Sequence, residues 1–337
     1  MSERVDVSPF RRVVRGAVSI AGILVLGALG LWCAGAVYYA DIESAAWRSV
    51  LTAVFVGGLV AVAIFVRPHR LARRIHLGAC AAVIVWFLLD APSNDRAWQP
   101  DVAVLPWAEI TGDRVTIHNI RHCDYRSEGD YTVRHEDRTL DLATLRSVDF
   151  MVVTWGAPSI AHTMMSFGFA DGSYVCISIE TRKEIGEGYS AIKGFFRQFE
   201  LTYVIADERD LVRLRTNFRG EQVYVYRLRT DMDVARQVFL DYLAQASRLR
   251  ERPEWYNVVT ANCTTMIRGH TKPYARDSRF DWRMLINGRI DEMAYERGTL
   301  DQTLPFAELK ERSLVNARAL AAGDGPDFSE RIRVGLP

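Results

Sequence analysis

The residues of this chain with the clearest chemical potential are a thiol and an imidazole. Cys263 lies in the run Thr260-Ala261-Asn262-Cys263-Thr264-Thr265, and His162 lies far upstream in a segment with strand character. A thiolate is a strong nucleophile, and a histidine beside it can take the thiol proton and pass it to a leaving group. The pair therefore predicts nucleophilic chemistry at a cysteine, provided that the fold brings the two side chains together.

The residues around Cys263 predict that it opens a helix. Thr260 and Asn262 are both favoured N-cap residues, and a short helix-compatible run follows and ends near Gly269. The unpaired amides and the dipole at a helix N-terminus favour a thiolate, so we expect the Cys263 pKa to lie below its usual value of about 8.5. We also expect Asn262, Thr264 and the amides of this turn to help form an oxyanion hole.

The segment that must position His162 is typical of a β-hairpin. In 160–169 and 174–180 most odd-numbered residues are apolar, and successive strand residues point to opposite faces of a sheet. Burying both apolar sets requires odd positions to pair with odd positions, which a three-residue loop at 170–172 provides. This register places Glu180 directly opposite His162, so we expect its carboxylate to orient the imidazole as a third catalytic residue.

Each of these residues also has a purely structural interpretation. A lone cysteine is often a small core residue, a strand histidine is often simply packed, and Glu180 has Arg182 and Arg197 as other ion-pair partners. Cys123 and Cys176 either form a disulfide, which leaves one free thiol, or are small buried residues. No spacing suggests a zinc site, and we expect neither a metal nor a cofactor.

The first 92 residues predict a membrane region. Three apolar segments, at about 16–39, 49–66 and 75–92, approach the roughly 20 residues that cross a bilayer. The third is the shortest, and a buried or re-entrant hairpin is its alternative. Arginines are concentrated in the N-terminal segment and in the second loop, whereas the first loop is mainly acidic. Because positive charge is enriched on the cytoplasmic side, this pattern predicts a cytoplasmic N-terminus and places the chain after residue 92 outside the cytoplasm.

The rest of the chain divides into a linker at 93–112, a domain at 113–310 and a C-terminal tail at 311–337, which we expect to be loosely ordered beyond Gly323. Strand candidates and an amphipathic helix at 231–250 predict an α+β domain with an antiparallel sheet. Lys+Arg 42 against Asp+Glu 41 leaves a net charge of +1, so no nucleic-acid partner is expected.

A glycine- and aromatic-rich segment at 185–199 predicts a mobile apolar loop that acts as a lid or as a rim that contacts lipid. We expect its residues Tyr189, Phe195 and Phe196, together with Arg182 beside it, to contact a substrate held in the bilayer. A plain connecting loop is the alternative.

An ordered set of motifs from Asp113 to His270, about half the chain, resembles the bacterial Lnb N-terminal periplasmic domain family. The set is specific in this order, whereas any single motif is weak. The motifs are Asn119-Ile120-Arg121, His162-Thr163-Met164-Met165-Ser166-Phe167-Gly168-Phe169, Ser178-Ile179-Glu180-Thr181-Arg182-Lys183-Glu184, Tyr203-Val204, Asp207-Glu208-Arg209-Asp210, Tyr256-Asn257 and Asn262-Cys263-Thr264-Thr265.

The resemblance implies a permuted papain-like fold, similar to that of the lecithin–retinol acyltransferase (LRAT) group, with His162 and Cys263 as the catalytic pair. The founding members of the family look like lipoprotein N-acyltransferases. This implies a membrane phospholipid as acyl donor, and a lipoprotein N-terminus or another envelope amine as acceptor. Together with the three apolar segments and the arginine pattern, it predicts a multi-pass protein of the bacterial inner membrane with its domain in the periplasm.

Two other functions fit the same residues. A papain-like cysteine hydrolase, an amidase or peptidase acting on the cell envelope, uses the same fold and the same pair. The other alternative is a non-enzymatic membrane scaffold whose cysteine is structural.

Overall fold

The computed structural model describes residues 8–42, 44–275 and 279–337, and the chain separates into two compact units. The first unit comprises the chain up to Ala91 together with Phe196–Gln198. The second comprises Pro92–Phe195 and Phe199–Pro337. The division at residue 91 agrees with the predicted end of the membrane region.

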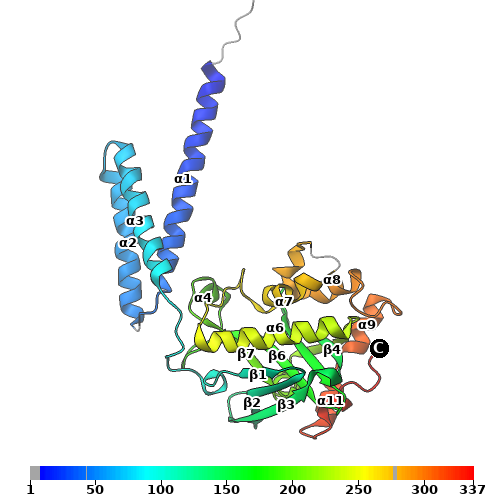
Figure 1. Cartoon of the computed structure of the whole chain (residues 1–337). Coiled ribbons are helices and arrows are strands. Elements are labelled where there is room, and N and C mark those ends of the chain that lie inside the picture. The colour runs from blue at the N-terminus through cyan, green and yellow to red at the C-terminus, as the bar shows by residue number, and fades with distance from the viewer. Residues whose placement is uncertain (1–7, 43, 276–278) are drawn as a thin grey trace, which may run out of the picture. The chain divides into compact units, whose positions relative to one another are not determined.

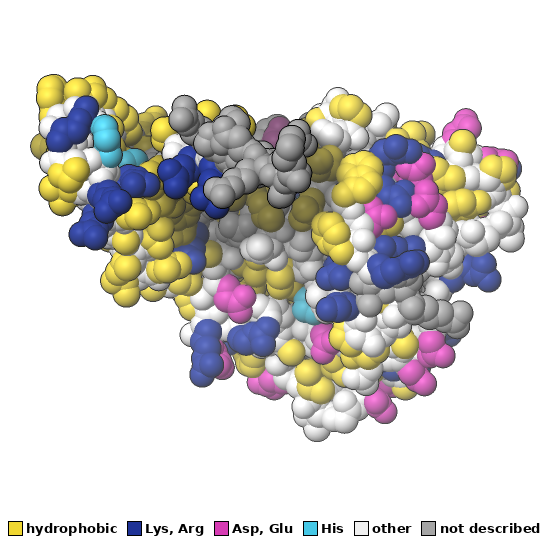
Figure 2. Space-filling model, turned by 90° about the horizontal axis from the view of Figure 1, so that it is seen from above, with side chains coloured by type: hydrophobic (Ala, Val, Ile, Leu, Met, Phe, Trp, Pro, Cys, Tyr) yellow, Lys and Arg dark blue, Asp and Glu magenta, His cyan; other side chains and the backbone are white. Residues whose placement is uncertain are grey.

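Three long helices form the first unit: α1 (Ser8–Tyr38), α2 (Ala45–Phe65) and α3 (His69–Leu89). Each contains a stretch that is long and apolar enough to cross a membrane, which for α1 is Val13–Tyr38. None of the residues of α2 is buried, and Figure 2 shows hydrophobic side chains over much of the three-helix unit. The three predicted membrane-length segments are therefore confirmed.

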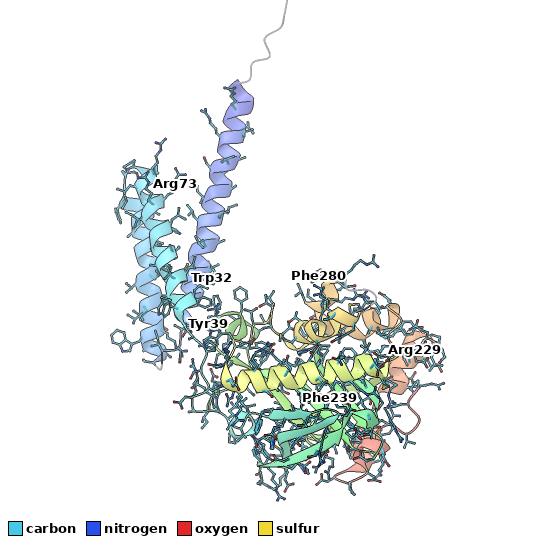
Figure 3. The ribbon with its side chains drawn as sticks, viewed as in Figure 1. Trp32, Tyr39, Arg73, Arg229, Phe239 and Phe280 are labelled. Carbon is cyan, nitrogen blue, oxygen red and sulfur yellow. The ribbon has the colours of Figure 1, made fainter. Side chains whose placement is uncertain are left out.

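The start of α3 differs from the prediction. The helix begins at His69 rather than near residue 75 and continues for 21 residues, so the third segment is one helix and not a hairpin. Arg70, Arg73 and Arg74 therefore lie on its first turns instead of in a loop. Figure 3 labels Arg73 at this end of α3, which is also the end of the unit where α1 begins.

The second unit is built around one eight-stranded sheet in the order β1-β2-β7-β6-β5-β4-β8, with β3 paired to β2 off this path. Neighbouring strands are antiparallel except where β2 meets β7 at Arg121 and Ala206. The strands are β1 (Trp107–Thr111), β2 (Arg114–Tyr125), β3 (Tyr131–Asp141), β4 (Leu145–Thr154), β5 (His162–Phe169), β6 (Tyr174–Arg182), β7 (Glu200–Ala206) and β8 (Gln222–Arg227).

Helices cover both faces of this sheet, so the unit is a mixed α/β domain and the predicted fold class is confirmed. In Figure 1, α6 runs along the sheet with α7 and α8 above it, and α11 lies below. The helices are α4 (Ala191–Phe195), α5 (Glu208–Arg213), α6 (Met232–Glu251), α7 (Cys263–Thr271), α8 (Ile290–Glu296), α9 (Phe306–Ser313), α10 (Asn316–Ala322) and α11 (Phe328–Arg331).

The hairpin of β5 and β6 has the predicted register. Met165 pairs with Ile177 and Phe167 with Val175, and Gly172 in the three-residue loop has a φ of +85°, which favours glycine. These apolar residues belong to the larger core beneath α6. Because odd positions pair with odd ones, His162 and Glu180 lie on the same face of the sheet.

Phe239 on α6 fixes this helix over the hairpin. Its ring contacts Phe167 at a centroid distance of 4.7 Å and Phe169 at 5.8 Å, and Figure 3 shows it between α6 and the sheet. Edge-on and tilted aromatic contacts of this kind stabilise a core beyond simple area burial.

The even-numbered face of the hairpin is also covered. Met164 and Cys176 pack into a second core with residues of α5, α10 and α11, such as Leu211 and Phe328. This second layer explains why the apolar Met164 interrupts an otherwise polar face. Cys176 is a buried free cysteine, and so is Cys123, so the disulfide alternative is wrong.

The predicted linker and tail need correction, because both are integral to the domain. Trp107–Thr111 forms β1, an edge strand paired with β2, so the domain begins well before residue 113. Val315, Phe328 and Ile332 are fully buried in the second core, so residues 311–337 are not a loose tail. The sequence does not reveal this packing because each segment is short and its apolar residues need partners that lie far away in the chain.

Candidate active site

Cys263 is the first residue of α7, and Asn262 is its N-cap, as predicted. The Thr265 amide donates to Asn262 Oδ1 and the Asn262 amide donates to Thr265 Oγ1, both at 2.9 Å, so a capping box fixes the helix start. The Asn262 side-chain amide also donates to the Val258 carbonyl at 2.6 Å. Asn262 therefore holds the turn that presents the thiol.

The predicted oxyanion hole is better assigned to main-chain amides than to the Asn262 side chain. The amides of Thr265 and Met266 donate to Asn262. Those of Cys263 and Thr264 have no acceptor within the helix, as at any helix start. Two adjacent amides beside a nucleophile are the usual donors to an oxyanion.

The Cys263 thiol is buried and interacts with both His162 and Thr163. Burial, the largest effect, opposes ionisation. The charge of His162 and hydrogen bonds from His162 and Thr163 outweigh it and lower the pKa of Cys263 to about 6. At neutral pH the sulfur is therefore mostly the nucleophilic thiolate.

A buried serine links the imidazole to Glu180. Ser178 Oγ lies 2.7 Å from His162 Nε2 and donates to Glu180 Oε1 at 2.7 Å. Because the serine proton goes to the carboxylate, Ser178 Oγ accepts the Nε2 proton of His162. The other ring nitrogen, Nδ1, is then the one left to exchange a proton with the thiol.

The predicted direct contact between His162 and Glu180 is therefore corrected. His162 Nε2 and Glu180 Oε1 lie 3.8 Å apart, beyond hydrogen-bond distance. Ser178 and Glu180 are two residues apart on β6, so both project from the same face, and the shorter serine side chain occupies the gap.

Arg215 fixes the far end of this chain of hydrogen bonds. Its guanidinium donates to Glu180 Oε1 at 2.8 Å and to the Leu211 carbonyl at 2.9 Å. Burial favours the neutral form of Glu180. The charges of Arg215 and His162, with the Ser178 hydrogen bond, nevertheless hold the pKa of Glu180 far below its usual range. Glu180 thus stays ionised and keeps accepting the serine proton.

Asn287 joins the start of β5 to the start of α7. Its Oδ1 accepts the Ala161 amide at 2.8 Å, next to His162, and its Nδ2 donates to Thr264 Oγ1 at 2.7 Å, next to Cys263. One buried amide therefore sets the spacing of the Cys263 thiol and the His162 imidazole.

The residue after Asn287 must be glycine for this link to form. The Gly288 amide donates to the Ser159 carbonyl at 3.1 Å, and a Cβ at Gly288 would lie 2.2 Å from the Pro158 carbonyl oxygen. The loop that leads into β5 is thus packed directly against the backbone at 288.

The predicted substrate-contact residues fall into separate places. Tyr189 is half exposed and hydrogen-bonds to Tyr256, and both phenols interact electrostatically with Cys263. Phe195 is partly exposed at the end of α4, while Phe196 belongs to the first unit, where its ring stacks on Tyr39 at 5.3 Å. Tyr189 is thus the predicted contact residue whose side chain interacts with Cys263.

Arg182 does not belong to the site. Its buried guanidinium donates to Asn94 Oδ1 and to the carbonyls of Val102 and Ala103, at 2.7 to 2.9 Å, and stacks over Trp98 at 4.1 Å. Arg182 therefore fastens the 94–103 segment to the sheet, and its predicted substrate contact is wrong.

Sequence reasoning missed three residues of the site: Ser178, Arg215 and Asn287. The two-residue spacing of Ser178 and Glu180 on a strand is a signal for the first. Arg215 and Asn287 have no local signal, because only the chain path brings them close.

Among the described residues, no group of three or more His, Cys, Asp or Glu is arranged to hold a metal ion.

Ser178→Ala tests the hydrogen-bond chain. Losing one hydrogen bond to a charged group costs about 1.5–3 kcal/mol, so we expect the pKa of Cys263 to rise by roughly one to two units. The pH dependence of Cys263 alkylation measures this shift. Ser166→Ala is the matched control, because Ser166 is an equally buried strand serine whose hydroxyl donates to Glu208 instead. An unchanged midpoint in Ser178→Ala would show that the serine does not support the imidazole.

The chain thus combines three membrane-length helices with a mixed α/β domain in which a buried cysteine at a helix start interacts with a strand histidine. Residues 131–288 match the family model described as the Lnb N-terminal periplasmic domain, which confirms the resemblance found in the sequence. The matched range contains Cys263, His162, Ser178 and Glu180, and it ends at the Asn287–Gly288 link. Neither the comparison with curated proteins nor the one with solved structures gives a match.

Proposed function

We propose that this protein is a membrane-anchored cysteine acyltransferase with a permuted papain-like domain. In this proposal, Cys263 takes an acyl chain from a membrane phospholipid and passes it to an amine, with a lipoprotein N-terminus as the preferred acceptor. The observation that carries the proposal is the buried thiol with a pKa of about 6 beside His162. The match to a periplasmic domain family and the three membrane-length helices support a lipid substrate.

The first half of the proposed reaction forms a thioester. The Cys263 thiolate attacks the carbonyl carbon of a phospholipid ester, and the amides at 263 and 264 stabilise the resulting oxyanion. The ester C–O bond then breaks, and the imidazolium of His162 gives its Nδ1 proton to the departing lysophospholipid oxygen. The products are an acyl thioester on Cys263, a neutral imidazole and a lysophospholipid.

The second half transfers the acyl group. An amine attacks the thioester carbonyl, the neutral His162 accepts a proton from the amine nitrogen, and the C–S bond breaks to restore the thiolate. Ser178 and Glu180 do not touch the reacting atoms in this scheme. They hold the Nε2–H and stabilise the imidazolium, so we assign them as positioning residues.

The proposed location is the bacterial inner membrane, with a cytoplasmic N-terminus and a periplasmic domain. The arginines at the start of α3 and those near the start of α1 lie at the same end of the three-helix unit, and positive charge is enriched on the cytoplasmic side of membrane proteins.

The proposal is tested by intact-mass measurement of the purified full chain in phospholipid nanodiscs. We expect a mass increase of one acyl chain that is released by hydroxylamine and is absent in Cys263→Ala. Cys123→Ala, which removes a buried cysteine outside the site, should keep the adduct. Transfer of the acyl chain to a synthetic diacylglyceryl-cysteine peptide is then measured as loss of the adduct from the protein.

Two outcomes would contradict acyl transfer. Cleavage of muropeptides or envelope peptides that depends on Cys263, without any acyl adduct, would favour the hydrolase. An adduct that persists in Cys263→Ala would show that the acyl group is carried elsewhere.

A further inference from the structure

The domain contains a cavity of about 750 Å³ that the proposed reaction does not use. This volume lies within the roughly 300–1,000 Å³ typical of small-molecule sites. The sheet contributes Phe150 and Met165 to the lining, α6 contributes Val234 and Val238, and α8 contributes Met293. The interior is therefore mainly aliphatic and aromatic, with little to satisfy a polar ligand.

The cavity runs along the nucleophile helix on a side that the thiol does not line. Thr264, Ile267, Thr271 and Lys272 of the α7 region border it, which corresponds to about 12 Å of helix. Thr264 is deeply buried, whereas Lys272 is exposed, so the cavity is deepest behind the helix start and opens toward the helix end. The apolar lining along this length of helix suits a hydrocarbon chain.

Basic side chains surround the open end. Arg229 and Lys272 are exposed and line the cavity together with Arg268 and Arg297, and Asp231 is the single acidic residue among the described residues of the lining. Figure 3 shows Arg229 near the start of α6, at the edge of the domain. This charge balance favours an anionic group at the opening.

The outer wall of the cavity carries exposed apolar side chains. Met284 lines the cavity. The nearby aromatic side chains of Trp282 and Phe280 are 55% and 64% exposed. Phe280 projects from the α7–α8 side of the domain in Figure 3. Exposed aromatic side chains near basic ones are typical of surfaces that contact a membrane interface.

We propose that this cavity binds a single-chain anionic amphiphile, with its hydrocarbon chain reaching toward Thr264 and its head group held at Arg229 and Lys272. This site is distinct from the thiol site, since none of Cys263, His162 and Tyr189 lines it. A free fatty acid and a lysophospholipid with an anionic head share the required chemistry. The proposal does not depend on acyl transfer.

The test uses the full chain with Cys263→Ala, so that no probe can be transferred to the thiol. The protein is reconstituted in nanodiscs of phosphatidylcholine and exposed to probes that carry a photoactivatable diazirine at the end of the hydrocarbon chain. The three probes are a fatty acid, a lysophosphatidic acid and a lysophosphatidylcholine. Peptide mapping should place the cross-links of bound probe on the cavity-lining segments of β4, β5, α6, α7 and α8.

Variants that fill the cavity from opposite walls should block this labelling. We expect Ala294→Trp and Val234→Trp each to reduce it roughly tenfold or more. Ala317→Trp, on an exposed position of α10, is the matched control and should not reduce it. The same substitutions in the chain that retains Cys263 should leave the alkylation midpoint near pH 6, which shows that the domain is folded.

Charge reversal at the opening tests the head-group preference. We expect Arg229→Glu and Lys272→Glu each to weaken labelling by the anionic probes about fivefold, while Arg146→Glu on β4 has no effect. A difference between the fatty acid and lysophosphatidic acid identifies the source of the anionic head. Equal labelling by lysophosphatidylcholine, or cross-links that persist in both tryptophan variants, would overturn the proposal.

Discussion

Replacing His162 with alanine is expected to move the midpoint of Cys263 alkylation from about pH 6 to above pH 8.5. Burial is the largest influence on this thiol and acts to raise its pKa, so the low value depends on the charge and hydrogen bond of His162. At pH 6 the thiolate fraction should fall from about one half to less than about one hundredth. Proposed acyl transfer should fall further, by roughly 10²–10⁴-fold, because the proton carrier is also lost.

The direction of the pH dependence follows from the sign of the shift. A thiol whose pKa is lowered to about 6 gains reactivity as the pH rises through 6 and loses it below, where the sulfur is protonated. Alkylation by iodoacetamide across this range, read as modification of the Cys263 peptide, gives the midpoint directly. His135→Ala removes a histidine of β3 outside the site and should leave the midpoint unchanged. If His162→Ala also keeps its midpoint near pH 6, His162 does not activate the thiol.

Replacing Arg333 with alanine is expected to destabilise the domain by about 3–5 kcal/mol. Arg333 lies just after α11 and is 8% exposed. Its guanidinium binds both oxygens of Glu208, at 2.6 and 2.7 Å, and donates to Asp149 at 2.8 Å. The two carboxylates are almost completely buried, so removing the cation leaves buried negative charge without its main partner.

Thermal unfolding of the full chain in detergent measures this effect. For a domain of this size, 3–5 kcal/mol corresponds to a decrease in Tm of roughly 6–20 °C. Arg312→Ala is the control, because Arg312 forms an exposed pair with Glu308 on α9, and such pairs contribute little. Equal Tm values for the two variants would mean that the C-terminal segment is not part of the cooperative domain.

Local patterns accounted for the positions of the nucleophile and the base. Strand alternation in the hairpin determines that His162 and Glu180 share a face, since only one register buries both apolar sets. Asn262 before Cys263 predicts a capped helix because its side-chain oxygen can accept the amide three residues on. Both features depend on neighbours within a few residues, so they are visible in the chain itself.

Other features depended on contacts between residues far apart in the chain. Arg182 carries a charge in a motif next to the hairpin, which suggested a substrate contact, yet its guanidinium is buried against residues 94–103. Side-chain direction at the end of a strand is determined by what packs there, and the sequence does not specify this. The same reason explains why the segment at 311–337 reads as a tail although Phe328 and Ile332 are buried.

The sequence by itself determined three membrane-length segments, the hairpin register and a thiol at a capped helix start, because hydrophobic length, period-two alternation and capping are local properties. Only the tertiary structure decided that Ser178 lies between His162 and Glu180, that Arg215 holds the carboxylate, and that Asn287 spaces the thiol from the imidazole. These residues come from separate elements, and a hydrogen bond between them exists only once the backbone path has brought them within about 3 Å.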